Sequence, residues 1–296
     1  MPELPEIETI KLQLQKHLIG QVITKLEKLH PKSVQGDIHK VAGKKITSVR
    51  RFGKMLALEL TDNLCIAIHF KMTGQLVLVT SDKKQVTSKK NRIVGGHPTA
   101  DWVKDLPSKH TRAIFHFKSG DKLYFNDQRL FGWIRILANK DSSDLSYLKS
   151  LGPEVWNLTD KEFQQRLIKS KRAIKLVLMD QGIISGAGNI YANDALWEAK
   201  IHPSAPANQL NSNQVQLLKQ ALIKVLQEGI KFGGATAADD TYINLYGMGG
   251  TYQKHFRVYA REGEACQRAD GGIIKKIKIG GRGSYFCPKC QILSKM

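Results

Sequence analysis

The sequence has 296 residues, of which 42% are hydrophobic and 7% aromatic, enough for one large globular domain or two ordinary ones. Lys and Arg outnumber Asp and Glu by 46 to 26, and the resulting net charge of +20 favours a polyanionic partner such as nucleic acid. No apolar run reaches the ~20 residues of a membrane span, and the acidic start is unlike a signal peptide. We therefore expect an intracellular protein of the cytoplasm or nucleoid rather than a secreted one.

The first 150 residues combine one helix with many short strands. Apolar residues recur at helical spacing from Ile7 to Leu18, and Gly20 follows as a stop signal. From there to about residue 140, short runs of β-branched and aromatic residues alternate with turn residues, which is typical of a β-sandwich or barrel. The polar, basic stretch 81–108 interrupts this pattern, and we interpret it as an exposed insertion loop.

From about residue 150 the pattern becomes helical. Thr159 with Glu162 three residues later is a capping-box signature. A longer helix is expected between Ser212, which can cap it, and Gly233, which ends it. The chain closes with a predicted β-hairpin. The predicted fold is α+β and multidomain, in three parts: an N-terminal β-sandwich with a leading helix (1–150), a helical domain (151–252) and a C-terminal hairpin finger (253–296).

The stretch MPELPE places a proline directly after the initiator methionine. Once Met1 is removed, Pro2 carries a free secondary α-amine, a group whose pKa is ordinarily near 8, so on the order of a tenth is neutral at pH 7. Such an amine can form an iminium with an aldehyde or with a sugar C1′. Glu3 can donate or shuttle a proton beside it, and Glu6 lies nearby. The alternative is that the proline only begins a helix.

The turn ISGAGN joins two predicted helices. Gly186 and Gly188 expose backbone N–H groups there, and the N-terminal end of the second helix also attracts anions. Asn189 adds a side-chain donor. A phosphate site fits this composition, although a tight turn between two helices explains the glycines equally well.

Three of the four cysteines lie near the C-terminus. The CPKC stretch supplies Cys287 and Cys290, which is half of a four-cysteine zinc site, and Cys266 should begin the other half. Ala269 stands where the fourth cysteine is expected. Zinc can still bind if Asp270 or a water completes the site, and a metal-free finger is the alternative.

Several loop residues have side chains suited to DNA. Met72, Arg129 and Phe131 can enter a duplex as wedges, whereas core packing is the alternative for Met72 and Phe131. Arg282 is expected at the tip of the C-terminal hairpin between two glycines, where it can approach a phosphate closely.

Taken together, PELPEIET, GAGNIYANDALW, KFGGAT, GTYQKHFRVYAREGEAC and GGRGSYFCPKCQ resemble the formamidopyrimidine-DNA glycosylase family, in the family's order and over nearly the whole chain. Leu4, Arg129 and Phe131 favour the oxidised-purine branch over the endonuclease VIII branch. The resemblance implies a β-sandwich, a helix–two-turn–helix domain and a zinc-finger-like hairpin, with DNA in the cleft between them and a monomeric protein.

The resemblance also implies an activity in base excision repair. The enzyme would flip a damaged purine such as 8-oxoguanine or a formamidopyrimidine out of double-stranded DNA. Pro2 would release the base through a Schiff base, and β,δ-elimination would then cleave the strand, with no cofactor beyond a structural metal. Alternatives are an oxidised-pyrimidine glycosylase and a non-catalytic damaged-DNA-binding protein. Intact Pro2, Glu3 and Lys54 argue against the second.

The resemblance assigns a role to each matching residue. The catalytic set is Pro2 (nucleophile), Glu3 (acid/base), Lys54 and Arg282. The substrate- and DNA-binding set is Glu6, His69, Met72, Arg129, Phe131, Asn189, Tyr259 and Lys276. Within it, Met72, Arg129 and Phe131 fill the vacated space, and Arg129 faces the orphaned cytosine. The metal set is Cys266, Cys287 and Cys290, and the stretch 233–251 forms the loop over the flipped base.

Overall fold

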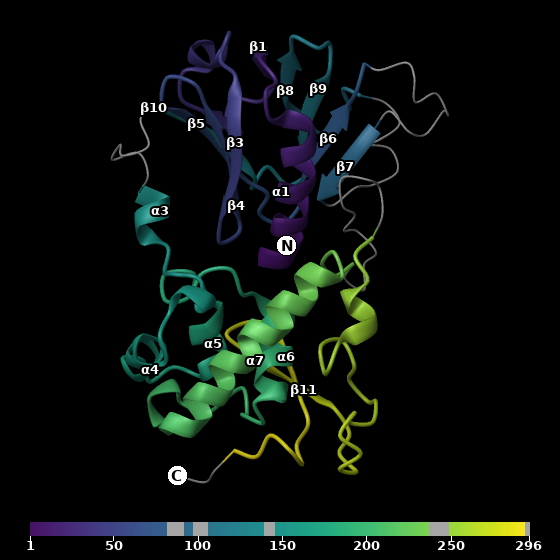
Figure 1. The fold of residues 1–296 in the computed structure, drawn as a ribbon. Coiled ribbons are helices and arrows are strands. Elements are labelled where there is room, and N and C mark those ends of the chain that lie inside the picture. The colour runs from purple at the N-terminus through teal and green to yellow at the C-terminus, as the bar shows by residue number, and fades with distance from the viewer. Residues whose placement is uncertain (82–91, 97–105, 139–145, 237–248, 294–296) are drawn as a thin grey trace. The chain divides into compact units, whose positions relative to one another are not determined.

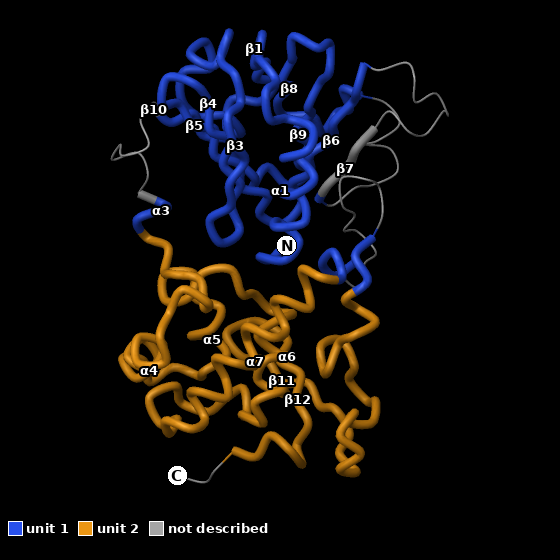
Figure 2. Tube along the Cα trace, viewed as in Figure 1, with its two compact units in different colours: residues 1–149, 232–251 blue, residues 150–231, 252–296 orange. Residues whose placement is uncertain are grey.

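The structure is a computed structural model that describes residues 1–81, 92–96, 106–138, 146–236 and 249–293. The chain divides into two compact units (Figure 2). Unit 1 comprises residues 1–149 and 232–251, and unit 2 comprises residues 150–231 and 252–296. In the described ranges, no helix is long and apolar enough to cross a membrane.

Unit 1 begins with the predicted helix, α1 (Leu4–Leu18). Ile7, Ile10 and Leu14 are fully buried on one face, as their helical spacing requires. The helix stops before Gly20, which adopts a φ of +88°. The buried face of α1 belongs to one hydrophobic core together with residues of both sheets described next.

The described part of unit 1 also contains two five-stranded sheets (Figure 1). One has the order β1-β8-β9-β6-β7 and the other β2-β10-β5-β4-β3. The strands are β1 (Ile23–Lys28), β2 (Val34–Gln35), β3 (Ile46–Phe52), β4 (Met55–Leu60), β5 (Leu64–His69), β6 (Gly74–Val79), β7 (Arg92–Gly96), β8 (Thr111–Phe117), β9 (Lys122–Asp127) and β10 (Trp133–Ala138). Leu56, Ile66 and Phe115 are among the core residues that the two sheets share. The predicted β-sandwich is therefore confirmed.

Strand β7 corrects the interpretation of 81–108 as a single loop. Residues 92–96 pair antiparallel with β6, from Arg92 opposite Val79 to Gly96 opposite Gln75. Gly96 has a φ of +119°, and a Cβ there would lie 2.4 Å from the carbonyl oxygen of Gly74. The apolar pair Ile93–Val94 was too short to stand out between polar stretches, which concealed the strand. Residues 82–91 and 97–105 lie outside the described residues.

Unit 2 contains α4 (Asp160–Ile168), α5 (Ile174–Met179), α6 (Asn189–Glu198) and α7 (Ser212–Lys231). The predicted capping box is confirmed, because the Glu162 N–H donates to Thr159 Oγ1 at 3.2 Å and the Thr159 N–H donates to Glu162 Oε2 at 2.8 Å. The expected Ser212 cap is wrong. Asn211 caps α7 instead, since its Oδ1 accepts from the Gln214 N–H at 2.9 Å.

Among the described residues, the other short elements are α3 (Ser146–Ser150) and the 3₁₀ turns η1 (Ile38–Val41) in unit 1 and η4 (Val155–Asn157), η5 (Ala207–Gln209) and η6 (Tyr252–His255) in unit 2. The predicted C-terminal hairpin forms from β11 (Lys275–Ile279) and β12 (Arg282–Phe286). Its two-residue turn is Gly280–Gly281, both at positive φ. Arg282 therefore begins β12 directly after the tip rather than occupying it.

The hairpin packs within unit 2, since the Tyr285 N–H donates to Asn193 Oδ1 of α6 at 2.8 Å. The division into compact units therefore places the finger together with the helices in unit 2, and it places residues 232–251 in unit 1. The division into three domains at residues 150 and 252 stays a prediction.

Candidate functional site

The start of α1 carries the predicted nucleophile and acid. Pro2 is buried, whereas Met1 in front of it is 46% exposed. Glu3 is the N-cap of the helix, and its N–H donates to Glu6 Oε2 at 2.7 Å. This capping box fixes both carboxylates in the first turn, directly beside the residue that would supply the amine. Glu3 and Glu6 are only 3% and 2% exposed, so both carboxyl groups are shielded from water.

Glu6 also holds a segment far away in the sequence. Its Oε1 accepts from the Ala235 N–H at 2.8 Å. Gly234 has a φ of +87°, and a Cβ there would lie 2.8 Å from Glu6 Cγ, so glycine allows this close approach. Ala235 forms an isolated β-bridge with Thr251. This bridge joins the two ends of the segment that is predicted to cover the flipped nucleotide. Residues 237–248 of that loop lie outside the described residues.

Lys54 lies in the tight turn between β3 and β4 and is 3% exposed. Arg51 supports this turn by donating from Nη1 to the carbonyl oxygen of Gly53 at 2.9 Å, and from Nε to Glu8 Oε2 of α1 at 2.6 Å. Burial opposes ionisation of Glu8, but hydrogen bonds from Lys11 and Arg51 hold its pKa below the usual value. The ion pair therefore ties the Lys54 turn to the helix that carries Pro2.

His69 lies at the end of β5 and is 3% exposed. Its Nδ1 accepts from the Lys71 N–H at 3.0 Å, and its Nε2 lies 3.1 Å from the hydroxyl of Tyr147. Burial and the charges of Lys71 and Lys54 lower the pKa of the imidazole to about 3. The ring is thus neutral near pH 7 and holds the turn that presents Met72.

This depressed pKa makes His69 a source of acid sensitivity. Between about pH 6.5 and pH 3 the unfolded chain binds a proton on this imidazole that the folded chain does not, so stability falls as the pH is lowered. From pH 7 to pH 5, we expect wild type to lose about 2 kcal/mol more unfolding free energy than His69→Gln. Urea unfolding at both pH values measures this difference. Equal losses in the two proteins would contradict the prediction.

Met72, Arg129 and Phe131 come together at the surface of unit 1. Met72 is 36% exposed and Phe131 is 51% exposed. The guanidinium carbon of Arg129 lies 4.8 Å from the centroid of the Phe131 ring, and its Nη1 lies 3.5 Å from Met72 Sδ. Core packing, the alternative for Met72 and Phe131, does not describe these exposed side chains.

In unit 2, the predicted phosphate turn precedes α6. Gly188 is the N-cap of this helix, and Gly186 has a φ of +102°. The Gly186 N–H donates to Gln181 Oε1 at 2.9 Å, so this one amide is used internally. Asn189 begins the helix and is half-buried, and Asn193 Nδ2 donates to its carbonyl oxygen at 2.6 Å.

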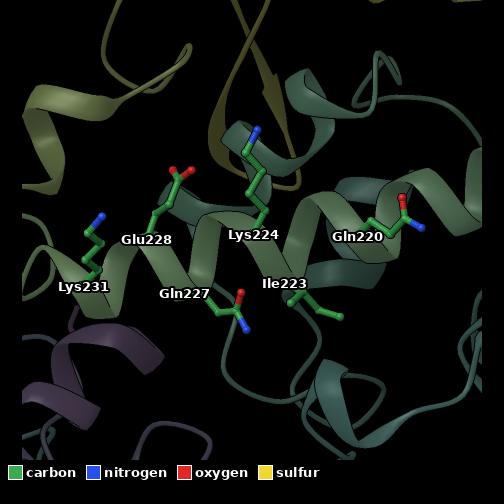
Figure 3. Close-up of a pocket in the computed structure, with 6 residues that line it drawn as sticks. All are labelled: Gln220, Ile223, Lys224, Gln227, Glu228 and Lys231. Atoms are coloured by element: carbon green, nitrogen blue, oxygen red, sulfur yellow. The ribbon is translucent and has the colours of Figure 1, made fainter.

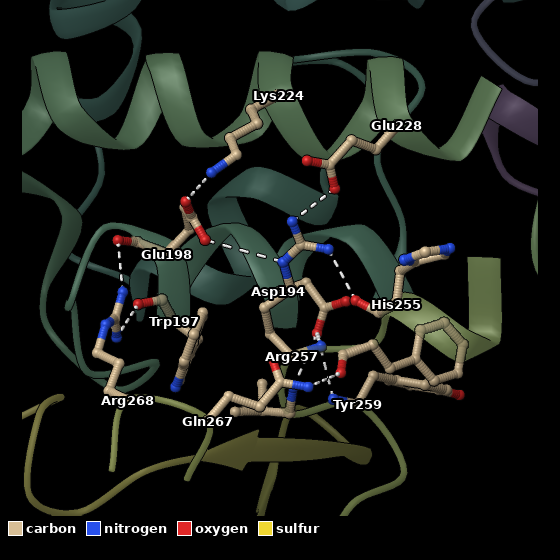
Figure 4. Close-up of polar contacts among 12 residues, drawn as sticks. Asp194, Trp197, Glu198, Lys224, Glu228, His255, Arg257, Tyr259, Gln267 and Arg268 are labelled. Carbon is tan, nitrogen blue, oxygen red and sulfur yellow. Dashed lines mark hydrogen bonds and ion pairs between the residues drawn. The ribbon is translucent and has the colours of Figure 1, made fainter. Parts of the chain in front are cut away.

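Asp194 was not singled out from the sequence but organises the segment that carries Tyr259 (Figure 4). Its Oδ1 accepts from the N–H groups of Arg257, Val258 and Tyr259 at 3.1–3.2 Å. Burial raises the pKa of this carboxyl to about 6, although these hydrogen bonds oppose the shift. Arg257 in turn donates to Glu228 Oε2 at 2.5 Å, which fixes the segment on α7. In the sequence, this role was indicated by an acidic residue within the largely apolar stretch IYANDALW.

Tyr285 of the hairpin links Lys276 to Tyr259. Lys276 Nζ lies 5.4 Å from the ring centroid of Tyr285, and the Tyr285 and Tyr259 rings meet edge to face at 5.3 Å. Arg282 is exposed at the start of β12. Lys175 of α5, another residue not predicted, is fully buried and donates from Nζ to the carbonyl oxygen of Gly283 at 2.5 Å. It therefore anchors the strand directly behind Arg282.

The C-terminal cysteines form a cluster with one carboxylate. Cys266, Asp270, Cys287 and Cys290 each offer one ligand atom, and these atoms all lie within 4.8 Å of one another. Burial raises the pKa of the Cys290 thiol to about 12, whereas a divalent cation favours the thiolate. Gly272 gives the cluster room, since a Cβ there would lie 2.3 Å from Cys287 Sγ. The positions of these four ligand atoms therefore agree with the interpretation, made from the sequence, that Asp270 replaces the missing cysteine as a ligand.

Two side chains donate hydrogen bonds to the sulfur atoms of this cluster. One belongs to α6, and the other is hydrogen-bonded to α6. Trp197 Nε1 donates to Cys266 Sγ at 3.4 Å. Arg268 Nη1 donates to Cys290 Sγ at 3.2 Å. It also donates to the carbonyl oxygen of Trp197 at 2.8 Å (Figure 4). These hydrogen bonds suit thiolate ligands and link the cluster to the helix that begins at Asn189.

Two hollows on unit 2 are lined by none of the predicted site residues. One follows α7 and is lined by Gln220, Ile223, Lys224, Gln227, Glu228 and Lys231 (Figure 3). Another lies beside α4, where Arg166, Lys169 and Arg172 contribute to its lining. Neither contains a predicted site residue, so they do not define the chemistry.

Comparisons with known proteins agree with this architecture. Residues 1–134 match the formamidopyrimidine-DNA glycosylase N-terminal domain, residues 151–241 match the formamidopyrimidine-DNA glycosylase H2TH domain, and residues 271–292 match the zinc finger found in FPG and IleRS. Formamidopyrimidine-DNA glycosylases of Desulforamulus reducens and Pelotomaculum thermopropionicum are 37% and 38% identical, over 98% of this chain and 99% of theirs.

Solved structures also match nearly the whole chain. The Lactococcus lactis Fpg in complex with DNA containing an abasic site is 34% identical, with a TM-score of 0.82 over 99% of this chain and 100% of that one. A mutant of that protein in complex with DNA containing Fapy-dG matches with the same identity, coverage and TM-score. A β-sandwich, an H2TH domain and a zinc finger in this order define a DNA glycosylase of base excision repair. The chain belongs to the formamidopyrimidine-DNA glycosylase family.

Proposed function

We propose that this chain is a bifunctional DNA glycosylase and AP lyase that excises oxidised purines, 8-oxoguanine and formamidopyrimidines, from double-stranded DNA. The observation that carries the proposal is the first turn of α1, where Pro2 is followed by Glu3 and Glu6, which share a capping box. An N-terminal secondary amine next to buried carboxyl groups suits iminium chemistry at a sugar carbon. The family relationship and the net charge of +20 support a DNA substrate.

The reaction follows from the chemistry of this amine. After removal of Met1, the Pro2 nitrogen attacks C1′, the bond from C1′ to the base breaks, and the base leaves with a proton. Glu3 moves that proton and assists ring opening of the sugar. The resulting iminium makes the C2′ hydrogen acidic, so the 3′ phosphate leaves by β-elimination and the 5′ phosphate by δ-elimination. Water then releases the sugar fragment and restores the amine.

The remaining predicted residues hold the DNA. Lys54, His69, Asn189, Tyr259, Lys276 and Arg282 grip the phosphates around the lesion, and Arg282 and Lys54 also act in the catalytic set. His69 does so as a neutral imidazole, because its pKa is about 3. Glu6 fixes the base of the segment 233–251 that covers the flipped nucleotide, supported by its hydrogen bond with Ala235. Met72, Arg129 and Phe131 fill the space that the damaged base vacates, and one monomer suffices.

A structural zinc ion completes the finger. Cys266, Asp270, Cys287 and Cys290 would hold it, since structural zinc takes four such ligands and these four candidate ligand atoms lie within 4.8 Å of one another. When bound, the ion would contribute folding energy to the hairpin.

The test is strand cleavage by protein lacking Met1 on matched duplexes that contain 8-oxoguanine or a formamidopyrimidine opposite cytosine, or thymine glycol opposite adenine. We expect the first two to be cut to a one-nucleotide gap with phosphate at both ends, and the third to be cut more slowly. Faster cutting of thymine glycol would favour the oxidised-pyrimidine alternative. Intact binding without any cutting would favour a non-catalytic damaged-DNA-binding protein.

A further inference from the structure

One buried carboxylate joins the two turns that carry Met72, Arg129 and Phe131. Asp127 is the last residue of β9, is fully buried, and lies opposite Gly74, the first residue of β6. One turn leads from β5 into β6 and contains Met72 and Thr73. The other follows β9 and contains Arg129 and Phe131. Asp127 therefore lies where the two turns meet.

Both carboxylate oxygens of Asp127 accept hydrogen bonds from these turns. Oδ1 accepts from Thr73 Oγ1 through a short hydrogen bond, and from the Arg129 N–H at 3.3 Å. Oδ2 accepts from the Gly132 N–H at 2.7 Å. Thr73 Oγ1 accepts from the same Arg129 N–H at 3.1 Å. A carboxylate suits this position because it is an acceptor at both oxygens.

These contacts hold a backbone shape that the sequence alone does not favour. Leu130, between Arg129 and Phe131, has a φ of +57°, a region that residues with a Cβ rarely adopt. Gly132 closes the turn, and a Cβ there would lie 2.9 Å from Phe125 Cζ and 3.1 Å from Asp127 Oδ2. The hydrogen bonds from residues 129 and 132 to one side chain thus fix the strained residue between them.

The consequence is visible in the three exposed side chains. Arg129 already stacks on Phe131 and contacts Met72 Sδ, although these residues come from two separate turns. Groups that are fixed before binding lose less conformational entropy when the partner arrives. The turns therefore present Met72, Arg129 and Phe131 as one preformed surface.

We propose that Asp127 and Thr73 are positioning residues that hold this surface in the geometry needed to fill the vacated space and read the opposite base. The proposal rests on the proposed function, which assigns that task to Met72, Arg129 and Phe131. Asp127 and Thr73 do not touch the reacting atoms. Their effect should appear only when the substrate is a duplex with a base to expel and a base opposite to read.

The test is Thr73→Val, which removes the bridging hydroxyl and keeps the shape, compared with Thr73→Ser, which restores it. On a duplex with 8-oxoguanine opposite cytosine we expect Thr73→Val to lower kcat/KM about five- to tenfold, the effect of one or two lost hydrogen bonds. Its preference for cytosine over adenine opposite the lesion should fall as well. Lyase activity on a single-stranded oligonucleotide with a preformed abasic site should stay within about twofold, since neither task arises there.

Two further variants separate the possible failures. Asp127→Asn keeps one acceptor and should show the same split between the two substrates, with melting temperatures confirming that both proteins are folded. A Thr73→Val protein with unchanged duplex activity, or with equal losses on both substrates, would overturn the positioning role, as would failure of Thr73→Ser to restore activity.

Phe131→Ala tests the space-filling role that the proposed function assigns to Phe131. If it excises normally, the space-filling role in the proposed function fails, whereas a defect in Phe131→Ala with normal Thr73→Val overturns only this inference.

Discussion

Replacing Glu3 with glutamine is expected to slow excision of 8-oxoguanine by about 10²–10⁴-fold, the usual contribution of a general acid or base. The change keeps the size of a side chain that is only 3% exposed, so the fold should be retained. The departing base and the opening sugar both need a proton donor, and glutamine cannot supply one. Single-turnover excision from a duplex measures the loss.

The matched control for Glu3→Gln is Asp62→Asn. Asp62 is an acid in the same unit, and its φ of +59° is one that asparagine tolerates well. We expect its excision rate to stay close to wild type. Trapping of Glu3→Gln on a preformed abasic site should fall far less than excision, because no base has to leave there. Excision by Glu3→Gln within tenfold of wild type would remove Glu3 from the acid/base role.

Replacing Asp270 with alanine is expected to cost the finger most of its zinc. Structural zinc in small domains is worth about 10–16 kcal/mol at pH 7, so one of four ligands corresponds to roughly 3 kcal/mol, or about 10²-fold in affinity. Wild type should contain one zinc per chain, while Asp270→Ala should lose it to a chelator of moderate strength. Elemental analysis before and after chelation measures this directly.

Cys65 offers the control for the metal prediction. It lies on β5 in unit 1, outside the cluster, so Cys65→Ser should retain zinc like wild type. Asp270→Cys should bind at least as tightly as wild type, since it restores four thiolates. Less than about a tenth of an equivalent of zinc in purified wild type would mean a metal-free finger. Unchanged retention in Asp270→Ala would mean that water or another group is the fourth ligand.

Local patterns in the sequence predicted the elements that depend on local interactions. The Thr159–Glu162 capping box and the helix ended by Gly20 follow from neighbouring residues, so both were predicted. Asn211 was missed as the cap of α7 because Asn211 and Ser212 are both good caps, and the choice is made by which side chain reaches residue 214. Strand β7 depends on its partner β6, which a short sequence window does not contain.

The polar residues that support the site were the least predictable. Asp127, Lys175 and Asp194 are fully buried and bind groups distant in the chain, such as the Gly283 carbonyl oxygen for Lys175. Their partners exist only once the chain has folded, so the sequence shows a charged residue in an apolar run and no more. The residues proposed for chemistry were recognised instead from motifs, because MPELPE and CPKC carry their reactivity in the residue types themselves.

In the proposed reaction the amine of Pro2 attacks the sugar, and covalent trapping with borohydride tests this step. Protein lacking Met1 is incubated with an 8-oxoguanine duplex and borohydride, which reduces the iminium, and the adduct is digested and mapped by mass spectrometry. We expect the sugar on the nitrogen of Pro2, and no adduct from Pro2→Gly or from protein that retains Met1. An adduct mapped to any lysine in the wild-type protein, or trapping by protein with Met1 in place, would mean that the Pro2 amine is not the nucleophile.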